Sequence, residues 1–145
     1  MKIAIGSDHA GFQAKTKIIE HLQKVGHIIV NYGTNNEESC DYPDYVHQVA
    51  KVVVEDDSFD FGILCCGSGQ GVNIVANKHK GIRSALCWSP EIAKLSREHN
   101  DANILAIPSR FVKEREIIKI VDAFLESKLE ERHQRRIDMI EIKNF

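Results

Sequence analysis

Residues 61–73 read FGILCCGSGQGVN. The first six, Phe61 to Cys66, form a short apolar run typical of a buried strand, and the glycine-rich segment after them is typical of a tight turn with bare backbone amides. We expect a helix to begin near Val72, which places those amides and the Cys66 thiol at its positive end, where anions are stabilised. The stretch therefore predicts an anion-binding loop with a cysteine at its mouth.

Strands and helices are expected to alternate on both sides of this stretch. Further strands are predicted over 3–5, 27–31, 82–87 and 104–107, and helices over 12–25, from Pro43 to about Val53, over 91–99 and around Ile117 to Leu125. This order predicts a three-layer α/β domain in which helices cover both faces of a five-stranded parallel sheet. Ligands bind such sheets at the carboxyl ends of the strands.

Length and composition indicate one domain over residues 1–145 that needs no disulfides to build its core. Hydrophobic residues make up 43% and charged residues 28%, the balance of a globular protein. The apolar run at the amino terminus is too short for a signal peptide or a membrane helix, so we expect a cytoplasmic protein without a membrane partner. A net charge of -2 disfavours nucleic acid as a partner. The charged tail, about 130–145, is interpreted as a final helix that packs on a neighbouring subunit.

The four cysteines, Cys40, Cys65, Cys66 and Cys87, are expected to be thiols, because their spacing fits neither a zinc site nor a Cys-x-x-Cys redox pair. Adjacent residues of a strand point to opposite faces, so Cys65 and Cys66 should not act together. We interpret Cys40, Cys65 and Cys87 as small buried hydrophobes. Cys66 can be another small buried hydrophobe, or its position beside the glycine-rich loop can make it a base or nucleophile.

A nucleotide site is disfavoured. Val72 stands where the dinucleotide fingerprint needs its third glycine, and Phe12 stands where a P-loop needs lysine.

Four groups of polar residues have both a structural and a functional interpretation. Asp8 can cap the following helix or accept hydrogen bonds from hydroxyls, and His9 can bind an anion or carry a proton. His99 and Asn100 can end a helix or line a site. Arg132 and Arg136 lie one helical turn apart, and they can form a solvated face or grip one phosphate together.

Five segments together resemble the ribose-5-phosphate isomerase B family, which includes the galactose-6-phosphate isomerase subunits. The segments, in order, span 6–12, 41–43, 66–71, 96–101 and 132–136. The resemblance implies a Rossmann-like sandwich and metal-independent interconversion of ribose 5-phosphate and ribulose 5-phosphate through an enediolate, a pentose phosphate pathway activity, with no cofactor. It also implies a homodimer or dimer of dimers with shared active sites.

The resemblance also assigns roles to residues. Cys66 corresponds to the base, Ser68 and the amides of Gly67, Gly69, Gly71 and Val72 to the cradle of the enediolate, and His99, with Asp8, to the group that opens the sugar ring. His9, Arg110, Arg132 and Arg136 resemble the phosphate grip, with His133 a further candidate. Tyr42 and Asn100 would line the sugar. No metal ligand is implied.

Two other functions fit the same motifs. A sister isomerase would act on a six-carbon sugar phosphate, such as allose or galactose 6-phosphate, by the same chemistry. A non-catalytic module would bind a sugar phosphate in the same glycine loop. The joint presence of Cys66, Ser68 and His99 favours an isomerase.

Overall fold

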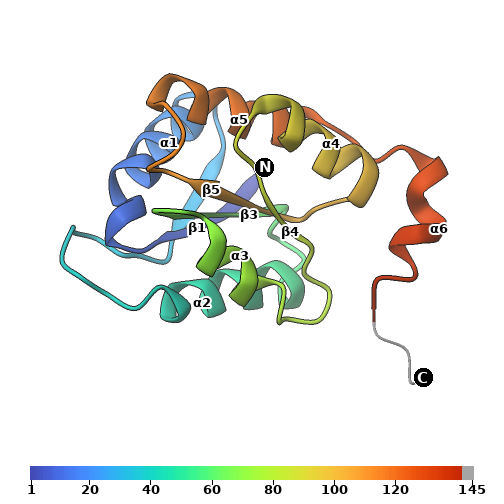
Figure 1. Cartoon of the computed structure of the whole chain (residues 1–145), viewed down its shortest axis with the longest axis horizontal. Coiled ribbons are helices and arrows are strands. Elements are labelled where there is room, and N and C mark those ends of the chain that lie inside the picture. The colour runs from blue at the N-terminus through green and yellow to red at the C-terminus, as the bar shows by residue number, and fades with distance from the viewer. Residues whose placement is uncertain (142–145) are drawn as a thin grey trace.

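The computed structural model describes residues 1–141, and its centre is a parallel sheet of five strands in the order β2-β1-β3-β5-β4 (Figure 1). The strands are β1 (Lys2–Ser7), β2 (Ile28–Asn31), β3 (Phe61–Cys66), β4 (Ser84–Leu86) and β5 (Ile104–Pro108). The expected five-stranded parallel α/β fold is confirmed. The second and fourth strands are shorter than predicted, beginning at Ile28 and Ser84.

Helices cover both faces of the sheet (Figure 1). One layer contains α1 (Phe12–Lys24), α4 (Pro90–Asn100) and α5 (Glu114–Glu126), and the other contains α2 (Tyr42–Glu55) and α3 (Gln70–Ala76). Short helices complete the chain: η1 (His9–Gly11), η2 (Glu131–His133) and α6 (Gln134–Ile137). Within residues 1–141, no helix is long and apolar enough to cross a membrane.

The two faces of β3 explain why its apolar run is continuous. Ile63 and Cys65 point into the core beneath α1, α4 and α5, whereas Leu64 and Cys66 point toward α2 and α3. A strand covered on both faces has no solvent side, so its side chains need not alternate between apolar and polar. The predicted separation of Cys65 from Cys66 is therefore confirmed.

A lysine lies in the core between α1 and the sheet, which the helical pattern did not predict. Lys15 is only 1% exposed, and its ammonium donates to the side chain of Asn31 and the carbonyl of Thr34. Burial lowers the pKa of Lys15. The Thr34 amide donates in turn to the Ser7 carbonyl, 2.8 Å away, so Lys15 fixes the loop beside the end of β1.

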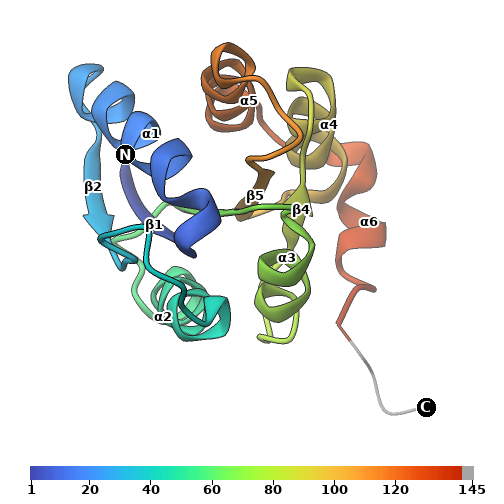
Figure 2. The ribbon, with the colours of Figure 1, turned by 60° about the vertical axis from the view of Figure 1, so that its left-hand side comes forward.

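The chain after α5 leaves the sandwich and runs beside α4 (Figure 2). It forms two short elements, η2 and α6, instead of the single helix expected from the tail. The Glu130 amide donates to the Glu98 carbonyl at 2.9 Å, which ties the start of the tail to the last turn of α4. The rest of the expected tail, 142–145, lies outside the described residues.

Candidate active site

The loops that follow β1, β3 and β5 meet at one edge of the sheet, because parallel strands end together. They surround a cavity of about 450 Å³. Most of its lining residues were predicted from sequence, and the full set is Asp8, His9, Ala10, Tyr42, Cys66, Gly67, Ser68, Gly71, Arg110 and Phe111.

Cys66 is the last residue of β3 and lies at the floor of this cavity. The residue is 5% exposed, and its Sγ accepts a hydrogen bond from the Gly69 amide at 3.0 Å. A backbone N–H aimed at sulfur stabilises negative charge there. The other core thiols are held neutral: burial raises the pKa of Cys65 far above its ordinary value and that of Cys87 to about 11. Cys66 is therefore the core thiol placed for chemistry.

The turn after Cys66 depends on a glycine at position 69. Gly69 has φ +73°, a left-handed conformation, and a Cβ there would collide with the Leu86 side chain. The helix α3 begins at Gln70, two residues before the predicted start, and its first backbone bond runs from Asn73 to the Gly69 carbonyl. Gly71 and Val72 come before Asn73 in the first turn of the helix, so their amides make no hydrogen bond within it.

The remaining loop residues present different groups to the site. The Gly69 amide is directed at the Cys66 sulfur instead of the open cavity. Ser68 is exposed, and its Oγ accepts from the Gln70 amide at 3.3 Å. The Val72 side chain is buried in the core, so this residue can offer a ligand only its backbone.

Asp8 and His9 are held in place by backbone contacts. Asp8 caps η1, its Oδ1 accepting from the Gly11 amide at 2.9 Å, so the structural interpretation of this residue is correct. Asp8 also lines the cavity, which leaves its functional role a prediction. The His9 Nδ1 accepts from the Cys40 amide at 3.4 Å, which leaves Nε2 to carry the proton in the neutral ring. Cys40 is half-buried beside His9, so its assignment to the core is wrong.

Tyr42 and Arg110 lie against the glycines of the loop. A Cβ on Gly71 would stand 2.6 Å from the Tyr42 ring, and one on Gly67 would stand 3.2 Å from the Arg110 side chain. These two glycines therefore let a phenol and a guanidinium approach the backbone of the loop.

Three residues of the site, Ala10, Ser109 and Phe111, were missed from sequence. Ser109 stands behind the cavity, where its Oγ lies 2.7 Å from the Cys66 carbonyl and 3.1 Å from the Ala10 carbonyl. It joins the loops after β1, β3 and β5, and its position after a strand end was the available signal. Phe111 lines the cavity with its side chain 78% exposed, and an aromatic residue in a polar loop was the signal for it.

The remaining predicted residues lie at the opposite edge of the sheet. His99 and Asn100 end α4, which leads into the start of β5, where the Asn103 carbonyl accepts from Gly62 at the start of β3. Gly62 and Cys66 are separated by about 13 Å, because a strand rises about 3.3 Å per residue. Within one chain, His99 and Asn100 are therefore far from the Cys66 cavity.

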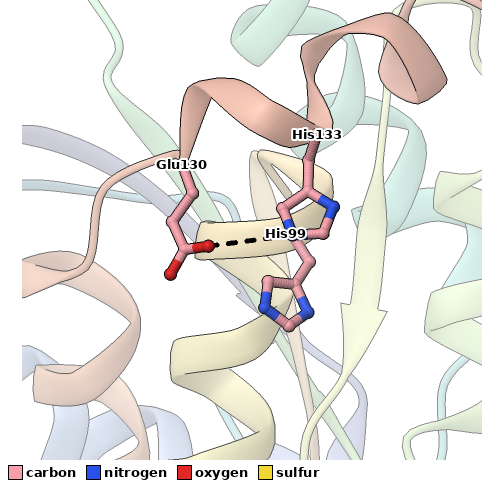
Figure 3. A group of neighbouring side chains, drawn as sticks. All are labelled: His99, Glu130 and His133. Atoms are coloured by element: carbon pink, nitrogen blue, oxygen red, sulfur yellow. Dashed lines mark ion pairs between the residues drawn. The ribbon is translucent and has the colours of Figure 1, made fainter.

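His133, one of the predicted tail residues, lies beside His99 at this second edge (Figure 3). The rings of His99 and His133 lie 4.3 Å apart between centroids, and Glu130 stands beside them. Burial, followed by the charge of Arg132, lowers the pKa of His133. Arg132 and Arg136 are exposed, and the Arg132 Nε donates to Glu130 Oε2 at 2.6 Å.

Arg83 holds the end of α4 that carries His99. Its Nε lies 3.0 Å from the carbonyls of both Asn100 and Asp101, and its Nη2 lies 2.9 Å from the Asp101 carboxylate. Asp101 ends the helix in the left-handed conformation, with φ +46°. These contacts fix the end of α4 that carries His99.

Comparisons with known proteins cover almost the whole chain. A family model described as Ribose/Galactose Isomerase matches residues 3–140. The chain is 46% identical over 140 residues to ribose-5-phosphate isomerase B of Escherichia coli, covering 96% of this chain and 93% of that protein.

Solved structures agree with this similarity. The structure of ribose-5-phosphate isomerase B from Clostridium thermocellum superposes with a TM-score of 0.93 at 45% identity, over 97% of this chain and 95% of that one. The enzyme from Mycoplasma genitalium, solved with bound ribulose-5-phosphate, gives 0.90 at 47% identity over 96% and 93% of the two chains.

Proposed function

The chain belongs to the ribose/galactose isomerase family, and from that membership we propose how its own residues interconvert ribose 5-phosphate and ribulose 5-phosphate. The activity is that of an aldose–ketose isomerase of pentose phosphate metabolism. The observation that carries it is the structure of the relative from Mycoplasma genitalium. That enzyme is 47% identical to this chain and was solved with bound ribulose-5-phosphate.

Cys66 is the base in this proposal. Isomerisation moves a proton between C2 and C1 of the open-chain sugar, so one group must take the proton and return it to the neighbouring carbon. The Cys66 sulfur lines the cavity and accepts a hydrogen bond from the Gly69 amide, which fixes its position for this step.

The loop after Cys66 stabilises the enediolate between the two proton transfers. The amides of Gly71 and Val72 are free of the α3 ladder, and the Ser68 hydroxyl lines the same cavity. Donors that are fixed before the reaction stabilise developing charge without reorganisation, which lowers the barrier.

The phosphate binds at the side of the cavity where His9 and Arg110 stand. The Cys40 amide at Nδ1 leaves the His9 Nε2–H available as a donor, and Arg110 adds a permanent positive charge. Asp8 and Tyr42 contact the sugar. Binding of the phosphate at a distance from the reacting carbons directs C2 toward Cys66.

A second copy of the chain completes each site in our proposal. His99, Asn100, Arg132, His133 and Arg136 lie at the opposite edge of the sheet from Cys66, so they serve a site only if they reach into that of a partner. A two-fold homodimer would complete two sites, because each chain contributes its His99 edge to the Cys66 cavity of its partner. His99 then opens the sugar ring, and the arginines and His133 add to the phosphate grip. A dimer of such dimers preserves the same arrangement.

A six-carbon sugar phosphate is the alternative substrate. A second cavity of about 430 Å³ adjoins the first and shares His9, Ala10 and Arg110 with it. A longer sugar phosphate has room to extend in that direction. The reaction and the roles of Cys66 and Ser68 are the same for both substrates.

An isomerase assay over ribose, allose and galactose phosphates tests the proposal. We expect kcat/KM to be at least tenfold higher for ribose 5-phosphate than for either six-carbon substrate. The reverse order would make the six-carbon sugar the substrate. Binding of these phosphates without turnover of any of them would instead identify a non-catalytic module.

A further inference from the structure

We propose that His99, Glu130 and His133 form a binding site for Zn²⁺, and that the bound ion inhibits the enzyme by occupying His99 (Figure 3). Binding of the ion depends only on these three side chains. The inhibition also rests on the proposed function, in which His99 opens the sugar ring. The inference thus adds a regulatory ligand to the proposed isomerase.

The three side chains already face one another. Each offers one ligand atom, and these atoms all lie within 4.8 Å of one another. The His133 Nε2 is 3.8 Å from Glu130 Oε2. Ligand atoms around tetrahedral zinc stand about 3.4 Å apart, given bond lengths of about 2.1 Å. Small rotations of the three side chains therefore bring them to one ion.

The backbone holds the three residues together before any ion binds. The Glu130 amide donates to the carbonyl of Glu98, the residue before His99, at 2.9 Å. The His133 amide donates to the Glu130 carbonyl at 3.0 Å. This 3₁₀ turn places residues i and i+3 on the same side, so Glu130 and His133 both point toward the end of α4.

His133 has an independent need for a partner. Its side chain is 12% exposed, and its Nε2 is closed to solvent without a hydrogen-bond partner among the described residues. An unsatisfied buried polar atom destabilises the folded protein. Coordination of an ion by this nitrogen would remove that destabilisation.

The ligand set selects the kind of metal. Two imidazoles and one carboxylate, with a fourth position open to water, are a typical zinc environment. Arg132 donates to only one carboxylate oxygen of Glu130, Oε2, at 2.6 Å. The positive charge of Arg132 opposes a cation, so binding should be reversible.

Zinc binding to the full chain is the direct test, measured by competition with a chromophoric chelator. We expect one ion per chain, bound at least tenfold more weakly by His133→Ala and by Glu130→Gln. The matched control is His47→Ala, which disrupts the other close pair of imidazoles, His47 and His79, 2.8 Å apart. This control should bind zinc like the unaltered protein.

Activity measured in the same titrations tests the inhibition. Each variant is compared with its own rate without metal, and Glu130→Gln should need at least tenfold more zinc for half-inhibition. Wild-type zinc affinity in both Glu130→Gln and His133→Ala, with loss of binding in Cys66→Ala or His47→Ala, would overturn the site. Zinc bound at the cluster without loss of rate would overturn the inhibition. Absence of turnover before metal is added would instead reject the proposed function.

Discussion

At the scale of single residues, the two adjacent thiols Cys65 and Cys66 lie in different environments because β3 is covered on both faces. Cys65 is fully buried under α1 and α5, whereas Cys66 reaches the cavity at the strand end. The side chains of neighbouring strand residues point in opposite directions, so one peptide bond separates a core residue from a candidate catalyst.

This contrast gives a matched pair of variants for the proposed base. Cys66→Ala should lower kcat by about 10²–10⁴-fold, the usual contribution of a general base, while the affinity for ribulose 5-phosphate changes little. Cys65→Ala removes the same atom from the other face and should leave kcat within a few-fold. Steady-state kinetics and calorimetric binding measure both quantities. A Cys66→Ala enzyme with a near-normal rate would exclude the thiol as the base.

Burial of Cys87 should make stability depend on pH. Its pKa rises from 9.0 to about 11 in the folded protein, so the unfolded chain loses the proton first as the pH increases. The contribution of this thiol is fully present below pH 9 and declines up to about pH 11, by about 1.4 kcal/mol per pH unit. Urea unfolding of Cys87→Ala should show a shallower decline than that of the unaltered protein. Cys40→Ala, which removes a thiol outside the core, should keep the original slope.

At the scale of elements, the turn between β3 and α3 shows what sequence could and could not predict. The apolar run predicted β3 with its observed bounds, since continuous burial gives a strong signal. The start of α3 was misplaced by two residues, because the left-handed Gly69 lets the helix begin directly after the turn. Three glycines in five residues do not reveal which of them has a positive φ.

Gly69 should be costly to replace. Gly69→Ala combines left-handed strain of about 1–2 kcal/mol with overpacking against Leu86 of about 1–3 kcal/mol. Gly26 also has a positive φ, +91°, but a Cβ there meets nothing within 4 Å, so Gly26→Ala should show the strain alone. Urea unfolding of the two variants separates these effects. Equal losses of stability would show that the Leu86 side chain moves aside without a measurable cost in stability.

The placement of the last strand and helices was predictable only in part. The motif residues around His99 were identified from sequence, and their distance from Cys66 follows from chain order, because a helix that precedes a parallel strand ends at the edge where that strand begins.

The burial of Lys15 and Arg97 was not predictable from helical spacing. Lys15 donates to a loop distant in sequence, and the Arg97 guanidinium contacts Asp101 and lies 4.6 Å from the centroid of the Phe61 ring.

At the scale of the whole molecule, the proposed shared site predicts that two inactive variants restore each other. In a mixed dimer of Cys66→Ala and His99→Ala, one of the two sites receives both intact residues. After unfolding and refolding together, equal amounts should recover about a quarter of the unaltered activity, since half of the dimers are mixed and each has one intact site. Each variant refolded alone is the control. Activity no greater than the sum of the two controls would place each complete site within one chain.

The length of β3 therefore bears on how the rate depends on the amount of enzyme. In the proposed shared arrangement, the two edges of a chain lie about 13 Å apart or more along β3 and serve different sites, so an isolated chain would hold two incomplete half-sites. Dilution below the dissociation constant of the proposed dimer should then lower the specific activity in proportion to concentration, by mass action. On this proposal, the expression level sets not only how many chains a cell contains but also what fraction of them is active.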